Sequence, residues 1–384
     1  MSVVSNIVLS SRVRRSPYFA ATQRYGCKAY SVYNHMYLPL YYESPEADYW
    51  HLVNGVTLWD VAVERQVEIA GPDAARLVQR LSPRDLSSCA VGQCKYVMMT
   101  DARGGIVNDP VLLKLAEDRF WLSLADSDVL LWAKGIALAG GYEVEVFEPD
   151  VSPLQLQGPL AATVGEALFG AALNDLKYFR FAEFDLDGMP LIVSRTGWSG
   201  ERGYEIYLQN GADGDRLWET IMEAGRPHGI APATPSAMRR IEGGLLSYGA
   251  DMTLENNPYE MNLGRLVDLE QEADFIGKAA LARIAQDGVR RCLAGLTIEG
   301  GREAAAGLER AAVVLDGQSI GRVTSVTYSP RLEQTIALAL VAAEHSAEGT
   351  ALTVQPEGQP EGQPGTSVRN ARVSPLPFVS KKTV

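Results

Sequence analysis

The chain has few of the residues that build metal and redox sites. Its 384 residues include four cysteines and four histidines, and no two cysteines form a CxxC pair. No HExxH motif or Cys/His cluster is present, so we expect no metal site. Four thiols in so long a chain are typical of a reducing compartment rather than of a disulfide-stabilised secreted protein.

Long apolar runs and nucleotide-binding loops are also missing. No stretch approaches the roughly 18 uninterrupted apolar residues of a membrane-spanning helix, so no membrane association is expected. Residues 10–16 are basic but precede no apolar core or cleavage site, so we expect no secretory signal and a cytoplasmic location. Neither a GxGxxG loop nor a Walker loop occurs, and residues 197–201, GWSGE, miss the GxSxG pattern of a serine hydrolase by one residue.

Positive charge is the scarcer sign. Lysine and arginine number 35 against 47 aspartates and glutamates, a formal net charge of −12, which argues against a nucleic-acid partner. Apolar residues make up 46% and charged residues 21%, as in an ordinary soluble globular protein. The length predicts two or three domains.

Strand and helix patterns alternate irregularly, which predicts an α+β fold. Residues 65–71 alternate like a strand, and residues 93–115 predict two strands joined by a turn at 101–105. A helix is predicted over 235–249, ending at Gly249. After about residue 288, short strands separated by Gly, Asp and Pro predict a small antiparallel barrel or sandwich. The repeat PEGQPEGQPG, 356–365, predicts a solvated loop of unknown role.

Two acidic residues stand in apolar surroundings. Asn108 and Asp109 end an apolar strand just before Pro110, so they either point to solvent at a sheet edge or place a carboxylate on a cavity wall. Glu205 lies within the strand pattern GYEIY, where it either faces water or accepts hydrogen bonds from two N–H groups of a heterocycle.

Arginines and aromatic residues leave similar alternatives. Arg239 and Arg240 precede an apolar turn and are either solvated at the surface or available to bind a substrate carboxylate. The tyrosine-rich segment 30–44, with Trp59 and Trp198, suits either core packing or a box for an onium cation.

Six stretches, taken in order, carry a family resemblance. They are LWDVAVERQVEIAGPDAARLVQRL, GQCKYVMMTDARGGIVNDPVLLK, GWSGERGYEIY, RRIEGGLLSYGADM, DFIGKAAL and GRVTSVTYSPRLEQTIALALV. Together they resemble the folate-dependent aminomethyltransferase, or glycine-cleavage T-protein, family over about residues 25 to 345. Within it, stretches such as KAYSVYNHMYLP and LSPRDLSSCAVGQCKY are more similar to members that demethylate a sulfonium compound.

The resemblance implies a fold of three domains. It is a cloverleaf with tetrahydrofolate in a central channel, two α+β domains and a C-terminal antiparallel β-barrel. The implied boundaries are 1–55 with 150–285 for the folate-binding domain, 56–149 for the second domain and 288–384 for the barrel.

The resemblance also implies roles for individual residues. Asp109 matches the acid beside the reacting folate nitrogens, and Glu205 matches the glutamate that binds the pterin. The remaining folate-lining residues implied are Tyr96, Arg240, Tyr248, Ser123 and Asp126. On the donor side we expect Tyr33, Trp59, Trp198 and Tyr204.

The implied activity is transfer of a methyl group from a small sulfonium donor to N5 of tetrahydrofolate. The alternatives are an aminomethyltransferase of the glycine cleavage system, a demethylase of another onium or methylamine donor, and a non-catalytic folate-binding protein. Folate and a small sulfonium compound are therefore the expected partners, and a homodimer stays open.

Overall fold

The structure is a computed structural model that describes residues 10–356 and 367–380, so 357–365 of the predicted repeat lie outside it. The chain separates into two compact units, and each is described by itself. The first unit takes residues 1–66, 149–196 and 203–234, and the second takes residues 67–148, 197–202 and 235–384.

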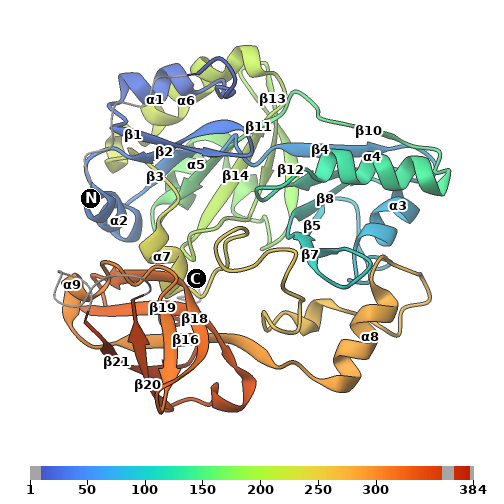
Figure 1. Ribbon diagram of the computed structural model, residues 1–384. Helices are drawn as coiled ribbons and strands as arrows, with labels where there is room; N and C mark the ends of the chain where they lie inside the picture. The colour runs from blue at the N-terminus through green and yellow to red at the C-terminus, as the bar shows by residue number, and fades with distance from the viewer. Residues whose placement is uncertain (1–9, 357–366, 381–384) are drawn as a thin grey trace. The chain divides into compact units, whose positions relative to one another are not determined.

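The first unit is built on a mixed six-stranded sheet (Figure 1). Its strand order is β12 (Phe181–Leu186), β13 (Met189–Ser194), β14 (Gly203–Leu208), β11 (Ser152–Gln157), β3 (Thr57–Asp60) and β15 (Ala231–Ala233). Neighbours are antiparallel except β15, which runs parallel to β3. The unit also contains α1 (Phe19–Arg24), β1 (Ala29–Tyr33), β2 (Met36–Tyr41), α2 (Pro45–Asn54), α5 (Ala161–Phe169) and α6 (Gly214–Gly225).

The two faces of this sheet differ in chemistry. Successive side chains of a strand point to opposite faces, so Leu156 and Tyr204 share one face while Gln155 and Glu205 share the other. The first face packs in an apolar core that includes residues of α5 and α6. The second face is also buried, with Gln155 1% and Glu205 4% exposed, yet it is polar. Buried polar side chains need hydrogen-bond partners, and a bound ligand can supply them, so this face is a candidate binding surface.

The second unit contains a five-stranded sheet. Its order is β10 (Glu145–Phe147), β4 (Gln66–Ala70), β9 (Arg119–Ser123), β8 (Val111–Ala116) and β5 (Gln93–Tyr96). In this sheet β10 with β4, β9 with β8 and β8 with β5 pair antiparallel. Helices α3 (Ala74–Leu81) and α4 (Val129–Gly140) contribute to its apolar core. The short strands β6 (Met99–Thr100) and β7 (Ile106–Asn108) form the hairpin expected at 101–105. Asp101 closes that turn by accepting from the N–H groups of Arg103 and Gly105.

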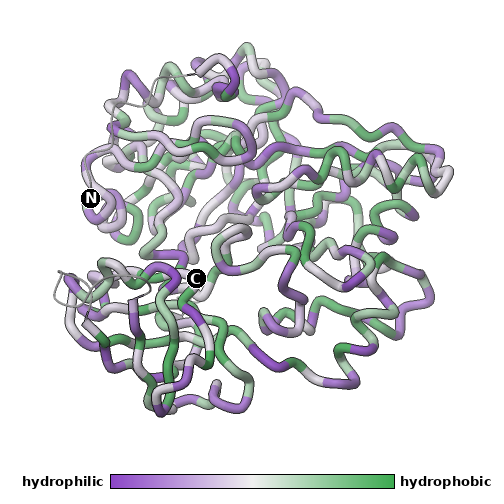
Figure 2. Tube along the Cα trace, viewed as in Figure 1, coloured by the Kyte–Doolittle hydropathy of each residue, from purple (hydrophilic) through white to green (hydrophobic). Residues whose placement is uncertain are grey.

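A closed antiparallel barrel forms the C-terminal part of this unit. Its order is β16 (Arg291–Ile298), β19 (Gln334–Ala342), β18 (Gln318–Ser329), β17 (Ala312–Leu315), β20 (Ala351–Gln355) and β21 (Arg369–Ser374). Strand β19 is apolar along most of its length, as Figure 2 shows, and all its residues except those at the two ends are buried. Helices α7 (Ala237–Glu242), α8 (Lys278–Asp287) and α9 (Gly301–Ala304) complete the unit.

The helix predicted over 235–249 was placed too long. Helix α7 ends at Glu242, and Gly244 then takes a φ of +62°, a left-handed conformation that glycine adopts without steric cost. The chain continues without regular structure through Tyr248, which is how this tyrosine leaves the helix and reaches the site described below.

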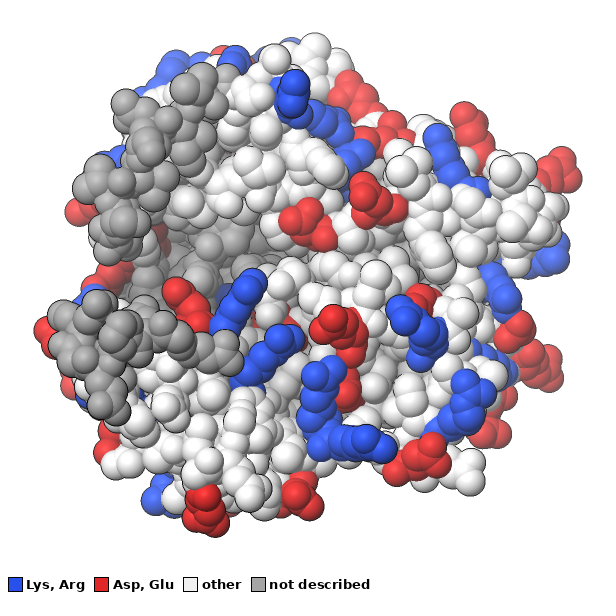
Figure 3. All heavy atoms as spheres, in the orientation of Figure 1, with Lys and Arg blue, Asp and Glu red and all other residues white. Residues whose placement is uncertain are grey.

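Two further features bear on the sequence-based expectations. No helix in 10–356 or 367–380 is long and apolar enough to cross a membrane. On the face drawn in Figure 3, acidic and basic side chains are interspersed. The α+β class and the C-terminal barrel are confirmed, while the three-domain boundaries stay a prediction.

Candidate active site

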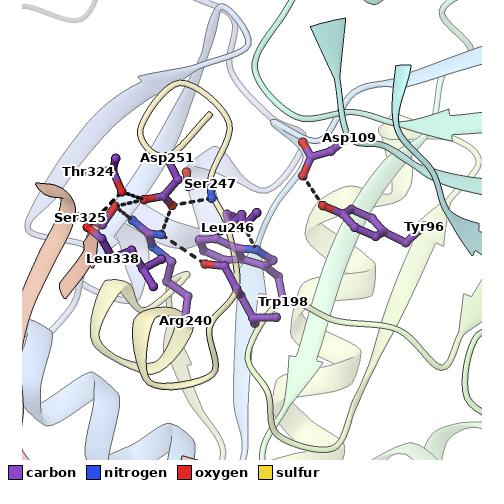
Figure 4. Close-up of polar contacts among 11 residues, drawn as sticks. Tyr96, Asp109, Trp198, Arg240, Leu246, Ser247, Asp251, Thr324, Ser325 and Leu338 are labelled. Atoms are coloured by element: carbon purple, nitrogen blue, oxygen red, sulfur yellow. Dashed lines mark hydrogen bonds and ion pairs between the residues drawn. The ribbon is translucent and has the colours of Figure 1, made fainter. Parts of the chain in front are cut away.

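Asp109 lies in the short connection between β7 and β8. The Tyr96 hydroxyl, at the end of β5, donates a hydrogen bond of 2.9 Å to Asp109 Oδ2 (Figure 4). The local fold fixes this geometry, because Tyr96 pairs with Val111 across the sheet and Val97 N donates to Pro110 O at 3.0 Å. The backbone pairing therefore sets the positions of Tyr96 and Asp109, and the Tyr96 hydroxyl holds one carboxylate oxygen.

The second oxygen of Asp109 is free to act. Oδ1 is shielded from solvent and has no hydrogen-bond partner among the residues that the structure describes. Burial raises the pKa of Asp109 to about 7, the charge of Asp251 adds to that rise, and the Tyr96 hydrogen bond opposes it. A carboxyl group titrating near neutrality with an unused oxygen can accept a proton or attract a cation.

Asn108 is buried, so the interpretation of this pair as solvent-facing is wrong for the amide. Its side chain is 0% exposed and donates to Ala125 O at 3.0 Å and Ser127 Oγ at 2.8 Å. Its Oδ1 accepts from Ala125 N at 3.1 Å. Asn108 thus fixes the 125–127 turn, whose middle residue, Asp126, is exposed. Helix α4 then begins at Val129.

Tyr248 lies close to Asp109 and Asp126. Its hydroxyl donates to Ile106 O at 3.1 Å, and burial together with the charges of Asp109 and Asp126 raises its pKa to about 12. Ser123, at the end of β9, pairs with Val111, the residue that also faces Tyr96. The second unit therefore brings Tyr96, Asp109, Ser123, Asp126 and Tyr248 to one region.

Arg240 is buried rather than solvated, and its charge is already neutralised. Its Nη1 lies 2.5 Å from Asp251 Oδ2, and Nη2 donates to Ser325 Oγ at 2.5 Å (Figure 4). Asp251 also accepts from Ser247 N at 2.9 Å and from the hydroxyls of Thr324 and Ser325 at 2.7 Å. The sequence reasoning missed Asp251, although it lies in the quoted stretch RRIEGGLLSYGADM.

Trp198 packs beside this ion pair. Its Nε1 donates to Leu246 O at 3.1 Å, and the Arg240 guanidinium carbon lies 5.8 Å from the ring centroid. Figure 4 shows the indole next to the Arg240 side chain. The side chain is partly exposed, which leaves some of the aromatic surface accessible.

Glu205, in the first unit, is buried and does not face water. Its Oε1 accepts from Gln155 Nε2 at 2.8 Å, and its Oε2 accepts from the Tyr207 hydroxyl at 3.0 Å and from the Thr196 hydroxyl. Burial raises the pKa of Glu205. Gln155 Oε1 is shielded from solvent and finds no partner in the described part of the chain, so this face of the sheet offers an unused acceptor beside a carboxylate.

The aromatic residues expected on the donor side divide between settings. Trp59 is 0% exposed and pairs with Gln155, so it shares the polar face of the sheet with Glu205. Tyr204 lies on the opposite face in the apolar core, and Tyr33 packs against that core. The structure therefore does not bring Trp59 and Tyr204 together. Trp198 belongs to the second unit, and donor contacts for all four residues stay predictions.

Comparison with known proteins places the chain in a family. The model of the GCVT N-terminal domain matches residues 18–271, and that of the glycine cleavage T-protein C-terminal barrel domain matches residues 291–380. The chain belongs to the glycine-cleavage T-protein family. This confirms the expected family, fold and cofactor class, a tetrahydrofolate-dependent transferase.

Individual relatives cover nearly the whole chain. The dimethylsulfoniopropionate demethylase DmdA of Ruegeria pomeroyi is 44% identical over 356 residues, 92% of this chain and 97% of its own length. The aminomethyltransferase of Bacillus subtilis is 32% identical over 349 residues, 89% and 95% of the two chains. The crystal structure of glycine cleavage system aminomethyltransferase T from Bartonella henselae matches with a TM-score of 0.83 and 26% identity, over 96% of this chain and 99% of that one.

Proposed function

We propose that this enzyme transfers a methyl group from dimethylsulfoniopropionate to N5 of tetrahydrofolate, giving 5-methyltetrahydrofolate and 3-(methylthio)propionate. The similarity to a demethylase of this sulfonium compound is 44% identity, against 30–34% for aminomethyltransferases of several bacteria, which favours the demethylase within the family. A cytoplasmic location and a homodimer stay predictions.

The buried environment of the Asp109 carboxylate is the observation that carries the proposal. A sulfonium donor is cationic, and methyl transfer to an amine leaves a surplus proton, so the reaction calls for a carboxylate that can serve both charges. Asp109 has a shielded oxygen without a partner and a pKa of about 7, raised by burial. A surface carboxylate would ionise near its ordinary value and be hydrated.

The chemistry is a direct displacement. Tetrahydrofolate supplies, at N5, the nucleophile that takes the methyl carbon. The electron pair of the broken C–S bond stays on sulfur, which departs as a neutral thioether, and the N5 proton is released. Asp109 stabilises the positive charge while it moves and accepts that proton, and Tyr96 holds the carboxylate in place through its 2.9 Å hydrogen bond.

Because the methyl group is already activated on sulfur, the protein mainly positions the reactants. Holding two reactants in line is worth up to about 7–11 kcal/mol of the barrier. On the folate side we assign that work to Glu205 and Gln155. The N–H groups along the edge of a reduced pterin suit the Glu205 carboxylate and the unused Gln155 Oε1. Trp198 is our candidate surface for the sulfonium cation.

The test is product analysis with alternative donors. Purified protein is mixed with tetrahydrofolate and either dimethylsulfoniopropionate, an aminomethylated lipoyl protein, or glycine betaine, and folates are identified by mass spectrometry. Methyl-folate formed with the sulfonium donor supports the proposal. Methylene-folate with release of ammonia from the lipoyl protein points to the aminomethyltransferase, and methyl-folate from betaine alone points to another onium donor. Folate binding without any product identifies a non-catalytic binder and refutes the proposal.

A further inference from the structure

Arg239 is a buried cation for which the proposed reaction has no use. It neighbours Arg240 on α7, is 1% exposed, and its Nε donates to Glu201 Oε1 at 2.8 Å. Its Nη2 donates to Gly200 O at 3.1 Å, and Nη1 lies 3.8 Å from Glu242 Oε2. The shortest polar contacts of the Arg239 side chain are therefore with the loop that contains Gly200 and Glu201.

The loop is shaped to accept this side chain. Gly200 has a φ of +68°, and a Cβ built on it would lie 3.0 Å from Arg239 Nη2, so a larger residue would be both strained and crowded. Glu201 N donates to Ser199 Oγ at 3.1 Å, which tightens the same turn. Arg331 lies 3.9 Å from Glu201 Oε1, a longer contact than that of Arg239.

Trp198 lies in the same loop, three residues before Glu201. The indole has one hydrogen bond to the rest of the unit, from Nε1 to Leu246 O at 3.1 Å. The consecutive arginines of α7 therefore act at two points. Arg239 binds the loop through the Gly200 carbonyl and the Glu201 carboxylate, while the Arg240 guanidinium lies beside the Trp198 ring.

We propose that the buried Arg239–Glu201 ion pair is a positioning device that fixes Trp198 as the surface for the methyl donor's cation. The inference rests on the proposed function for its catalytic consequence, but the placement of Trp198 is a separate claim. In the described part of the chain, no polar contact links Arg239 or Glu201 to Asp109 or Tyr96, so we assign their effect to Trp198. The attraction between a cation and an aromatic ring depends steeply on where the cation lies over the ring face. Displacing the Trp198 indole should therefore weaken binding of the methyl donor.

The experiment uses the full-length protein with two substitutions that weaken the ion pair, Glu201→Gln and Arg239→Lys. Glu201→Gln removes the closer of the two carboxylates that face Arg239 and leaves the longer contact of 3.8 Å to Glu242. Arg239→Lys keeps the charge while losing the Gly200 contact. If one variant fails to fold, the other still tests the inference. Glu260→Gln is the matched control, because Glu260 pairs with Arg291 at 2.9 Å in the same unit and does not contact residues 197–202 in any described interaction.

In the two ion-pair variants, two measured quantities should change and two should stay the same. The KM for dimethylsulfoniopropionate should rise about tenfold, and the fluorescence of Trp198, read as the difference from the same protein carrying Trp198→Phe, should become more accessible to acrylamide. The kcat and the Kd for tetrahydrofolate should stay within about twofold. Glu260→Gln should change none of the four.

A double-mutant cycle separates positioning from general damage. In a Trp198→Phe background, Glu201→Gln should raise the donor KM no further; an undiminished tenfold rise would overturn the inference. Unchanged Trp198 quenching in both ion-pair variants would overturn it as well. If Trp198→Phe alone leaves the donor KM unchanged, the donor role assigned to Trp198 under the proposed function fails, whereas the quenching result still decides whether the ion pair positions the loop.

Discussion

Removing the Tyr96 hydroxyl should shift the pH dependence of catalysis to higher pH. Tyr96 donates to Asp109 Oδ2 at 2.9 Å and thereby stabilises the ionised carboxylate against the burial that raises its pKa. In Tyr96→Phe that stabilisation is lost, so the pKa of Asp109 should rise further. If the carboxylate is the active form, kcat/KM increases with pH through this pKa. The rising limb of the pH profile should therefore move to higher pH.

The size of the shift follows from the contact that is lost. A hydrogen bond to a charged group is worth about 1.5–3 kcal/mol. Since one pKa unit corresponds to about 1.36 kcal/mol, the pKa should rise by about one to two units. From a starting pKa of about 7, the ionised fraction at pH 7 falls from about one half to between a tenth and a hundredth. We therefore expect kcat/KM at pH 7 to fall about five- to fiftyfold and to recover above about pH 9.

The assay is the pH profile of kcat/KM for methyl transfer, which reports groups of the free enzyme. Tyr248→Phe is the matched control, because its hydroxyl donates to Ile106 O and not to Asp109, so its limb should move by less than about half a unit. An unmoved limb in Tyr96→Phe, or a limb moved to lower pH, would refute the assignment of Asp109 as the titrating base. A uniform loss at every pH would mean that Tyr96 acts only on geometry.

Three further outcomes are expected. Asp109→Asn should lower turnover by about 10²–10⁴ while tetrahydrofolate still binds in a titration, and unchanged turnover would remove Asp109 from the mechanism. Glu205→Ala should weaken folate binding by about 1–3 kcal/mol, whereas Glu183→Ala, at an exposed position of β12 in the same sheet, should not; equal folate affinities of the two variants would contradict the pterin role. Asp60 is 2% exposed and burial raises its pKa to about 6, so its ionisation opposes folding, an effect absent below about pH 4 and complete above about pH 6. Asp60→Asn should therefore gain up to about 3 kcal/mol of unfolding free energy relative to the parent between pH 4 and pH 7 in urea titrations, and a gain that does not change with pH would contradict this linkage.

The candidate site was only partly predictable from single residues. The position of Asp109 at the end of an apolar strand, before Pro110, identified it as unusual without the structure. The role of Asn108 could not be found in this way, because the partners of its amide are Ala125 and Ser127, about twenty residues further along the chain. The neutralisation of Arg240 depends in addition on Ser325, which lies on a barrel strand.

The sequence by itself determined the α+β class, the order of most helices and strands, the C-terminal barrel and the family. The class and the order of elements depend on periodicity and turn residues, which act locally because side chains alternate in strands and recur every 3.6 residues in helices. The family, and a barrel rather than a sandwich, came from the resemblance of the six stretches. Only the tertiary structure decided which polar residues are buried, which carboxylate keeps an unused oxygen, and that Trp59 and Tyr204 lie on opposite faces of one sheet. The physical reason is that the solvation and the hydrogen-bond partners of a polar side chain depend on residues far apart in the chain. Local sequence patterns do not contain that information.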